Sequence, residues 1–191
     1  IESLIHNQYG ELIHYDSVAT FTDGVTQEDM DTLEGDLSAD GHIDDFLLNC
    51  GYSDDVKSSE DTETAEYVIV DDKNAFKDYV TLRTRRKHND VVLGDSGVVI
   101  TEKLSKDLGV KKGDKITVTS SAGKQAEAVV SSITEMYVNH YVYISTEYYN
   151  ELFENIPEHN RVLIKISGDV NETESYMGDE YLSRDYIKGV S

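Results

Sequence analysis

The chain of 191 residues has one proline, one cysteine, no tryptophan and only 17 basic residues. A single cysteine, Cys50, excludes an internal disulfide and any zinc cluster built on cysteines. The basic residues face 38 acidic ones, so the formal net charge is −21. This charge excludes nucleic acid bound through its phosphates, because such binding needs a basic surface. No run approaches the roughly 18 apolar residues that a membrane-spanning helix requires.

The chain has enough hydrophobic residues to form a folded core. Hydrophobic residues make up 38% of the chain, with 13 tyrosines and 4 phenylalanines, which argues against disorder despite the charge. The length suits one ordinary domain or two small ones. The chain starts at Ile1 and shows no signal-peptide pattern, and we expect it to be a soluble part of a larger protein.

Local patterns predict an α+β fold. Residues 11–22 are rich in β-branched and aromatic residues and predict a strand. Thr26, with Asp29 three positions later, is typical of a helix start with a capping box, and residues 46–56 predict the returning strand. Short strands and helices then alternate between residues 66 and 166. Together these patterns predict a β-α-β start followed by a β-rich region.

One acidic stretch resembles the beginning of an EF-hand calcium loop, which places oxygen ligands at fixed positions around a glycine. The candidate ligands are Asp36, Ser38, Asp40 and Asp44. The last position of such a loop needs a bidentate carboxylate, but Leu47 stands there. We favour an acidic turn between helix and strand, and keep a calcium-binding, adhesin-like module as one alternative function.

The sequence Gly94-Asp95-Ser96-Gly97 resembles the nucleophile loop of chymotrypsin-like serine proteases. That chemistry needs a histidine base and an orienting acid beside the serine. The histidines lack the sequence context of that family at His6, His14, His42 and His88. A β-turn before a strand is the favoured interpretation, and a secreted hydrolase that uses Ser96 with a histidine is the first alternative function.

His140 lies in a predicted strand that is rich in tyrosine. The histidines show no His-Glu-x-x-His pattern and no pair at helical spacing. We therefore expect His140 to pack or to form hydrogen bonds, and predict no metal. Neither a Gly-rich phosphate loop nor a dinucleotide fingerprint is present, so no cofactor is predicted.

Two segments are candidates for contact with a partner. Tyrosines, whose apolar rings carry a polar tip, are common at interfaces, and they are concentrated at Tyr137, Tyr141, Tyr143, Tyr148 and Tyr149. This cluster fits a strand packed on both faces or a surface for a partner or substrate, and we predict the surface. The basic residues at 83–88 are expected to pair with the protein's own carboxylates.

Residues 98–119 read as a strand, a short helix, Gly109, a turn with Gly113-Asp114, and a second strand. The pattern continues through residues 127–134 and 143–149. Over residues 98–166, this sequence resembles the MacB-like extracytoplasmic core domain of FtsX-like ABC transporter permeases. Similar hairpins occur in double-psi barrels and in AbrB-like DNA-binding proteins, and the net charge opposes the DNA-binding interpretation.

The resemblance implies a porter-like α+β subdomain, 1–66 and 158–191, with an inserted, smaller β-rich subdomain at 67–157. It implies a non-catalytic domain on the extracytoplasmic side of the cell membrane, without cofactor or catalytic residues. The ATPase would be a separate subunit or domain. The domain would couple ATP-driven movement of membrane helices to export of peptides or lipids, lipoprotein release or antimicrobial-peptide resistance, with a cationic peptide, a lipid or an extracytoplasmic protein as partner.

Overall fold

The computed structural model describes residues 7–168 and 170–191 and divides the chain into two compact units. Unit 1 consists of Ile1–Ile13 and Cys50–Glu158, and unit 2 consists of His14–Asn49 and His159–Ser191. The backbone therefore passes between the units at residues 13/14, 49/50 and 158/159. None of the helices in the described part of the chain combines the length and apolar character that a bilayer span needs.

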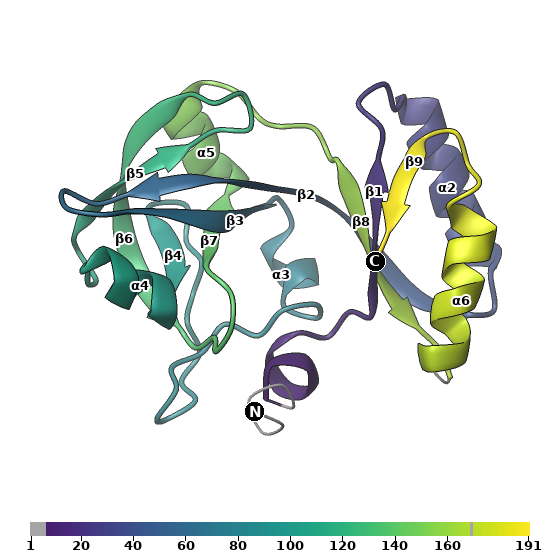
Figure 1. The fold of residues 1–191 in the computed structure, drawn as a ribbon, viewed down its shortest axis with the longest axis horizontal. Helices are drawn as coiled ribbons and strands as arrows, with labels where there is room; N and C mark the ends of the chain where they lie inside the picture. The colour runs from purple at the N-terminus through teal and green to yellow at the C-terminus, as the bar shows by residue number, and fades with distance from the viewer. Residues whose placement is uncertain (1–6, 169) are drawn as a thin grey trace. The chain divides into compact units, whose positions relative to one another are not determined.

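Unit 2 is an antiparallel sheet covered by two helices (Figure 1). Its strand order is β2-β8-β1-β9. The strands are the first part of β2 (Ile43–Lys57), β8 (Arg161–Ile166), β1 (Ser17–Phe21) and β9 (Ile187–Val190). Helices α2 (Gln27–Ala39) and α6 (Val170–Tyr181) contribute to the same core as the sheet, where Leu33, Phe21 and Met177 pack together. Thr26 and Asp29 form the predicted capping box at the start of α2.

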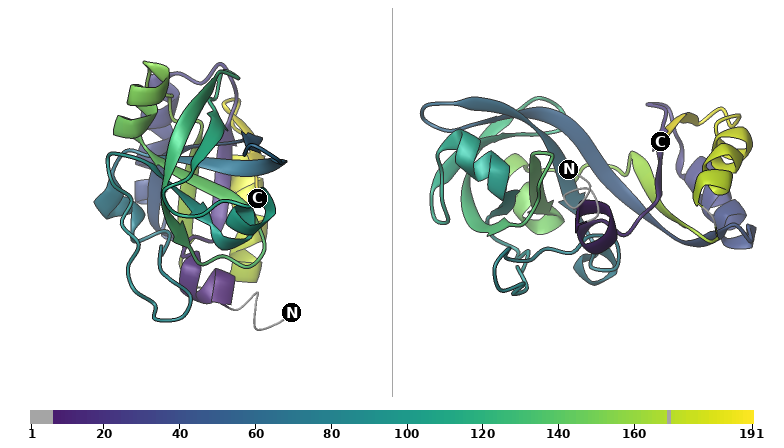
Figure 2. Two further views of the ribbon diagram at one scale, coloured as in Figure 1. Left: turned by 90° about the vertical axis from the view of Figure 1, so that its left-hand side faces the viewer. Right: turned by 60° about the horizontal axis from the view of Figure 1, so that its bottom comes forward.

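Unit 1 contains six strands whose pairings close into a ring, as Figure 2 helps to follow. These strands are β3 (Thr62–Val70), β4 (Val98–Thr101), β5 (Lys115–Thr119), β6 (Gln125–Thr134), β7 (Tyr141–Ser145) and the second part of β2. Around the ring the order is β2-β3-β7-β4-β6-β5, and Lys57 pairs with Thr117 to return from β5 to β2. The pairings β3–β7 and β4–β6 are parallel, and the others are antiparallel.

Short helices complete unit 1. They are η1 (Asn7–Leu12), a π-helix, and the α-helices α3 (Lys73–Phe76), α4 (Glu102–Leu108) and α5 (Thr146–Phe153). Leu104 of α4 and Tyr149 of α5 are fully buried in the same core as Ile100 and Val130 of the strands. Helix α4 ends at Gly109, whose φ of 68° is the left-handed conformation that glycine adopts without strain. The predicted strand–helix–turn–strand pattern is thus present.

The α+β class is confirmed, since the chain combines helices with a mixed sheet. The division into units differs from the expected one at 66/67 and 157/158. Residues 50–57 belong to unit 1 because they form a hairpin with residues 62–69. Residues 12 and 13 also belong there, since Leu12 is buried and Ile13 pairs with Val80. Residues 1–6 of the expected first subdomain lie outside the described residues.

Candidate functional site

The EF-hand-like stretch does not form a calcium loop. Asp36 and Ser38 lie on helix α2, Asp40 ends that helix, and Asp44 is exposed on β2. The carboxylate of Asp36 pairs with Arg184, and Asp40 accepts hydrogen bonds from Tyr181 Oη at 2.6 Å and Tyr176 Oη at 3.0 Å. The calcium-binding alternative has no geometric support, because the helix continues through the first ligand positions.

The tyrosine cluster divides into buried and partly exposed members. Tyr143, Tyr148 and Tyr149 are buried in the core of unit 1, so their prediction as a binding surface is wrong. Helix α5 places the hydroxyls of Tyr148 and Tyr149 against the β5–β6 hairpin, where they accept hydrogen bonds from backbone N–H groups. Tyr137 and Tyr141 are partly exposed, and for these two the surface remains a prediction.

Ser96 lies exposed in the turn before β4. The histidines whose ring contacts are defined bond elsewhere: His42 faces Asp40 at 3.0 Å, and His140 faces Asp107 at 2.9 Å. His88 occupies an exposed turn with a φ of 52°, and His6 lies outside the described residues. These contacts give the hydrolase alternative no geometric support.

The basic residues at 83–88 form one side and the tip of a small hairpin, in which Arg83 pairs with Asp90. Arg83 Nε donates to the buried carboxylate of Glu135 at 2.7 Å, and its Nη2 donates to Glu11 at 2.6 Å. Arg85 reaches Glu102 at 3.3 Å. Pairing with the protein's own carboxylates is therefore confirmed for Arg83 and Arg85.

The hairpin also forms one wall of an apolar pocket that the sequence analysis missed. The pocket has a volume of about 360 Å³ and is lined by the end of β3, by α3 and by residues 77–82 and 90–93. Phe76, Val80 and Leu93 supply buried apolar side chains, while Val92 at the rim is 72% exposed. A volume above about 300 Å³ with apolar walls is typical of a small-ligand site.

Three charged side chains lie among the pocket's lining residues: Lys73, Lys77 and Asp90. The ammonium of Lys73 donates to Asp95 and stands 3.8 Å from Glu147. The hydrogen bond to Asp95 is the main reason why the pKa of Lys73 is raised. Lys73 therefore stays positively charged, and an apolar group that enters the pocket meets a rim that carries both lysines and carboxylates.

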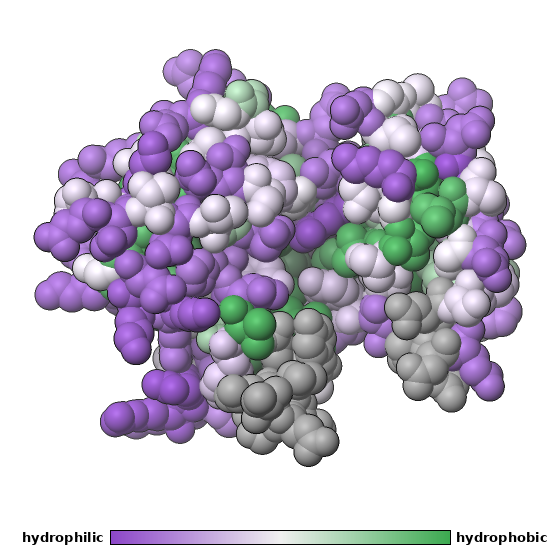
Figure 3. Space-filling view, viewed as in Figure 1, coloured by the Kyte–Doolittle hydropathy of each residue, from purple (hydrophilic) through white to green (hydrophobic). Residues whose placement is uncertain are grey.

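The outer surface around such a pocket is polar. The face of the molecule in Figure 3 is mostly hydrophilic, as expected for a chain with 29% charged residues. Exposed large apolar side chains among the described residues are Val92, Val129, Val138, Ile156 and Leu182. Of these, Val92 lines the pocket. The pocket therefore combines an exposed apolar side chain with a concave apolar surface.

Comparisons with known proteins gave matches among solved structures only, since no family model and no curated protein matches the chain. The chain is similar to the periplasmic region of MacB from Actinobacillus actinomycetemcomitans, with 12% identity and a TM-score of 0.49 over 99% of this chain and 93% of that one. It is also similar to the extracellular domain of the noncanonic ABC-type transporter YknZ from Gram-positive bacteria, with 10% identity and a TM-score of 0.49 over 91% of this chain and 100% of that one.

Proposed function

We propose that the chain is a non-catalytic extracytoplasmic domain of an ABC transporter permease of the FtsX and MacB type. In the full protein, ATP hydrolysis by a separate subunit or domain moves membrane helices, and this domain passes the movement to a substrate or partner outside the membrane. The observation that carries the proposal is the sequence resemblance over residues 98–166. The proposal is supported by the consecutive strands and helices from β4 to β8 that this stretch forms.

The two-unit organisation fits this role. Three backbone connections join the units, and one of them is the continuous strand β2. A displacement of one unit therefore reaches the other through covalent chain. The net charge of −21 attracts a cationic ligand such as a basic peptide, and the apolar pocket in unit 1 receives an apolar group of the substrate or partner.

The coupling role predicts an ATP-dependent change between the units in the full-length permease with its ATPase. Thr32 of unit 2 and Lys124 of unit 1 are exposed, so Thr32→Cys and Lys124→Cys together accept a donor and an acceptor dye. Cys50 is only 3% exposed and does not compete for label. We expect the energy-transfer efficiency in membranes to change when ATP is added.

The control pair lies within unit 1. Lys103→Cys with Lys124→Cys places both dyes on the same unit, and its transfer efficiency is expected to stay constant with ATP. Equal efficiencies with and without ATP for the pair across the units would contradict coupling. The permease assignment itself fails if the full-length protein lacks apolar segments of about 20 residues beside this domain.

A role of the pocket in binding predicts a site-specific loss of affinity for an anionic apolar dye. Anilinonaphthalene sulfonate has an apolar ring system for the walls and a sulfonate that can approach the lysines among the lining residues. Val92→Asp puts a carboxylate at the rim of the pocket, which we expect to weaken dye binding roughly tenfold. The measurement is a fluorescence titration of the folded domain.

Leu182→Asp is the matched control, because Leu182 is a 49% exposed apolar residue of unit 2. The same change in charge there is expected to leave dye binding unchanged. If both variants lose the dye equally, the loss reflects net charge and the pocket is not the binding site.

A further inference from the structure

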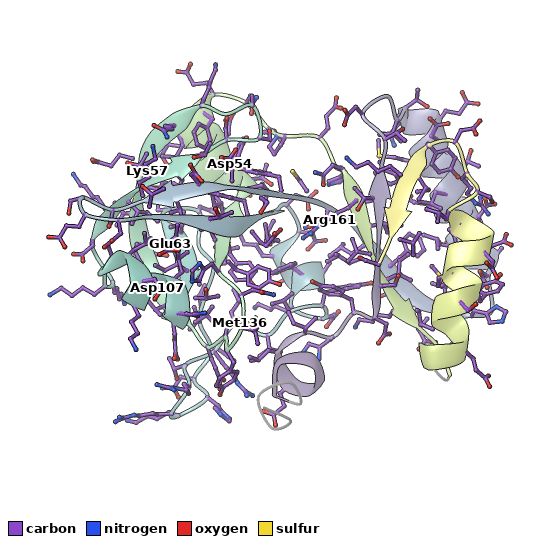
Figure 4. All side chains as sticks on the ribbon, in the orientation of Figure 1. Asp54, Lys57, Glu63, Asp107, Met136 and Arg161 are labelled. Atoms are coloured by element: carbon purple, nitrogen blue, oxygen red, sulfur yellow. The ribbon has the colours of Figure 1, made fainter. Side chains whose placement is uncertain are left out.

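Three ionisable side chains converge in unit 1 at some distance in sequence from one another. Glu63 lies on β3, Asp107 lies near the end of α4, and His140 directly precedes β7. One ligand atom from each falls within 4.8 Å of the other two. Figure 4 labels Glu63 and Asp107 on their neighbouring elements. The backbone fixes His140 beside β3, because the N–H of Glu66 donates to its carbonyl at 2.9 Å.

The imidazole of His140 is surrounded by hydrogen-bond acceptors. Its Nε2 stands 2.9 Å from Asp107 Oδ2, and its Nδ1 stands 3.3 Å from the carbonyl oxygen of Thr64 and 3.9 Å from Glu63 Oε2. A neutral imidazole carries only one N–H, so one ring nitrogen must direct its lone pair at an oxygen. The cluster therefore brings one imidazole nitrogen and two carboxylate oxygens close together, which is a candidate ligand set for a metal ion.

The contact between Nδ1 and the carbonyl oxygen of Thr64 favours a metal on Nε2. When Nδ1–H donates to the carbonyl of Thr64, the tautomer is fixed and the Nε2 lone pair points toward Asp107. A hydrogen bond from the distal nitrogen to a backbone carbonyl is the usual support of a metal-binding histidine. The side chain of His140 is 15% exposed, and those of Glu63 and Asp107 are about one-third exposed, so water has access to complete the coordination.

We propose that Glu63, Asp107 and His140 bind a divalent transition-metal ion, for which Zn²⁺ is the best match. One imidazole nitrogen with two carboxylates suits zinc, whereas calcium and magnesium prefer ligand sets made of oxygen alone. Zinc holds such ligands at about 2.0–2.2 Å, which separates neighbouring ligand atoms by about 3.3 Å. Binding at Nε2 would need a slight opening of the His140–Asp107 contact and a rotation of the partly exposed Glu63 side chain, whose Oε2 lies 3.9 Å from Nδ1.

Bound metal would join β3, α4 and the start of β7, three segments that are far apart in sequence. A bound ion would therefore stabilise unit 1, whether or not the chain has the proposed transporter function. The two carboxylates carry negative charge that one uncharged imidazole does not balance, and the chain as a whole is strongly acidic. The electrostatic field therefore also favours a cation here.

The experiment is a calorimetric titration of the 191-residue chain with Zn²⁺, paired with a thermal melt. We expect one ion per chain, a raised melting temperature, and no comparable shift with Mg²⁺ or Ca²⁺. His140→Ala and Asp107→Asn should each lower the zinc affinity by at least roughly tenfold. Asp107→Asn keeps a hydrogen-bonding side chain of the same shape, so it serves if His140→Ala does not fold.

His42→Ala is the matched control. His42 Nδ1 also contacts a carboxylate, Asp40 Oδ1 at 3.0 Å, but it belongs to unit 2. This variant removes one histidine–carboxylate contact and should bind zinc as the wild type does. The proposal is overturned if the wild type gives no zinc-dependent heat, or if Asp107→Asn and His140→Ala bind zinc with unchanged affinity.

Discussion

Replacing Asp40 with alanine is expected to lower the free energy of unfolding of unit 2 by about 3 kcal/mol. The side chain of Asp40 is 8% exposed, and it accepts hydrogen bonds from Tyr181, Tyr176 and the backbone N–H of His42. Alanine leaves the hydroxyl of Tyr181, on a residue that is 1% exposed, without this acceptor. Urea denaturation, combined with hydrogen exchange of unit 2 amides, measures the loss.

Asp44 provides the control for Asp40. It belongs to the same acidic stretch but is exposed, so Asp44→Ala should change the free energy of unfolding by no more than about 0.5 kcal/mol. A similar loss for both variants would show that the stretch acts through its total charge. The hydrogen bonds of Asp40 would then contribute little to stability.

The same network predicts a dependence on pH. Burial alone raises the pKa of Asp40, but the hydrogen bonds from Tyr181, His42 and Tyr176 outweigh it and lower the pKa from 3.8 to about 2. Because the folded pKa lies below the unfolded one, the ionised carboxylate stabilises the fold above about pH 4, and this contribution disappears as the pH falls toward 2. Its size is about 2 kcal/mol. Asp40→Asn should remove this part of the acid sensitivity in denaturation curves measured at each pH.

Gly97→Ala is expected to destabilise unit 1 by about 3 kcal/mol. Gly97 has a φ of 78°, and an added Cβ would lie 2.6 Å from Cβ of Ser131 and 3.1 Å from the carbonyl oxygen of Val129. The substitution therefore combines backbone strain with a clash against strand β6. Chemical denaturation of the variant measures the loss, and the double variant with Ser131→Gly should recover the part that is due to the clash with the Ser131 side chain.

Gly109→Ala separates the two contributions. Gly109 also has a positive φ, 68°, but an added Cβ there meets no atom within 4 Å. Only the cost of the left-handed backbone applies, about 1 kcal/mol. Equal losses at the two glycines would mean that β6 moves aside at no cost, contrary to the close packing beside Gly97.

Local sequence signals were sufficient for much of the fold. The capping box at Thr26 and Asp29 and the glycine end of α4 at Gly109 depend on residues only a few positions apart. The run at 66–70 is apolar enough to form a strand in almost any context, and it lies within β3. Such features follow from backbone hydrogen bonding and side-chain shape within one element.

Features that depend on distant segments were not predictable. The parallel pairing of Val68 with Tyr143 and the contact of Lys57 with Thr117 join parts of the chain that no local pattern relates. The β3–β7 pairing also brings His140 beside β3, and packing in the core of unit 1 leaves Tyr143 only 1% exposed. The sequence alone therefore misplaced the buried tyrosines, and it gave no sign of the apolar pocket between α3 and residues 90–93.

Strand β2 has a mechanical consequence. Its first half, Ile43–Asn49, is bonded to β8, and its second half, Cys50–Lys57, is bonded to β3. A pull along the axis of this strand loads each ladder in shear, so its hydrogen bonds must break together and not one after another. Each half of β2 is therefore held in its own sheet against tension along the strand.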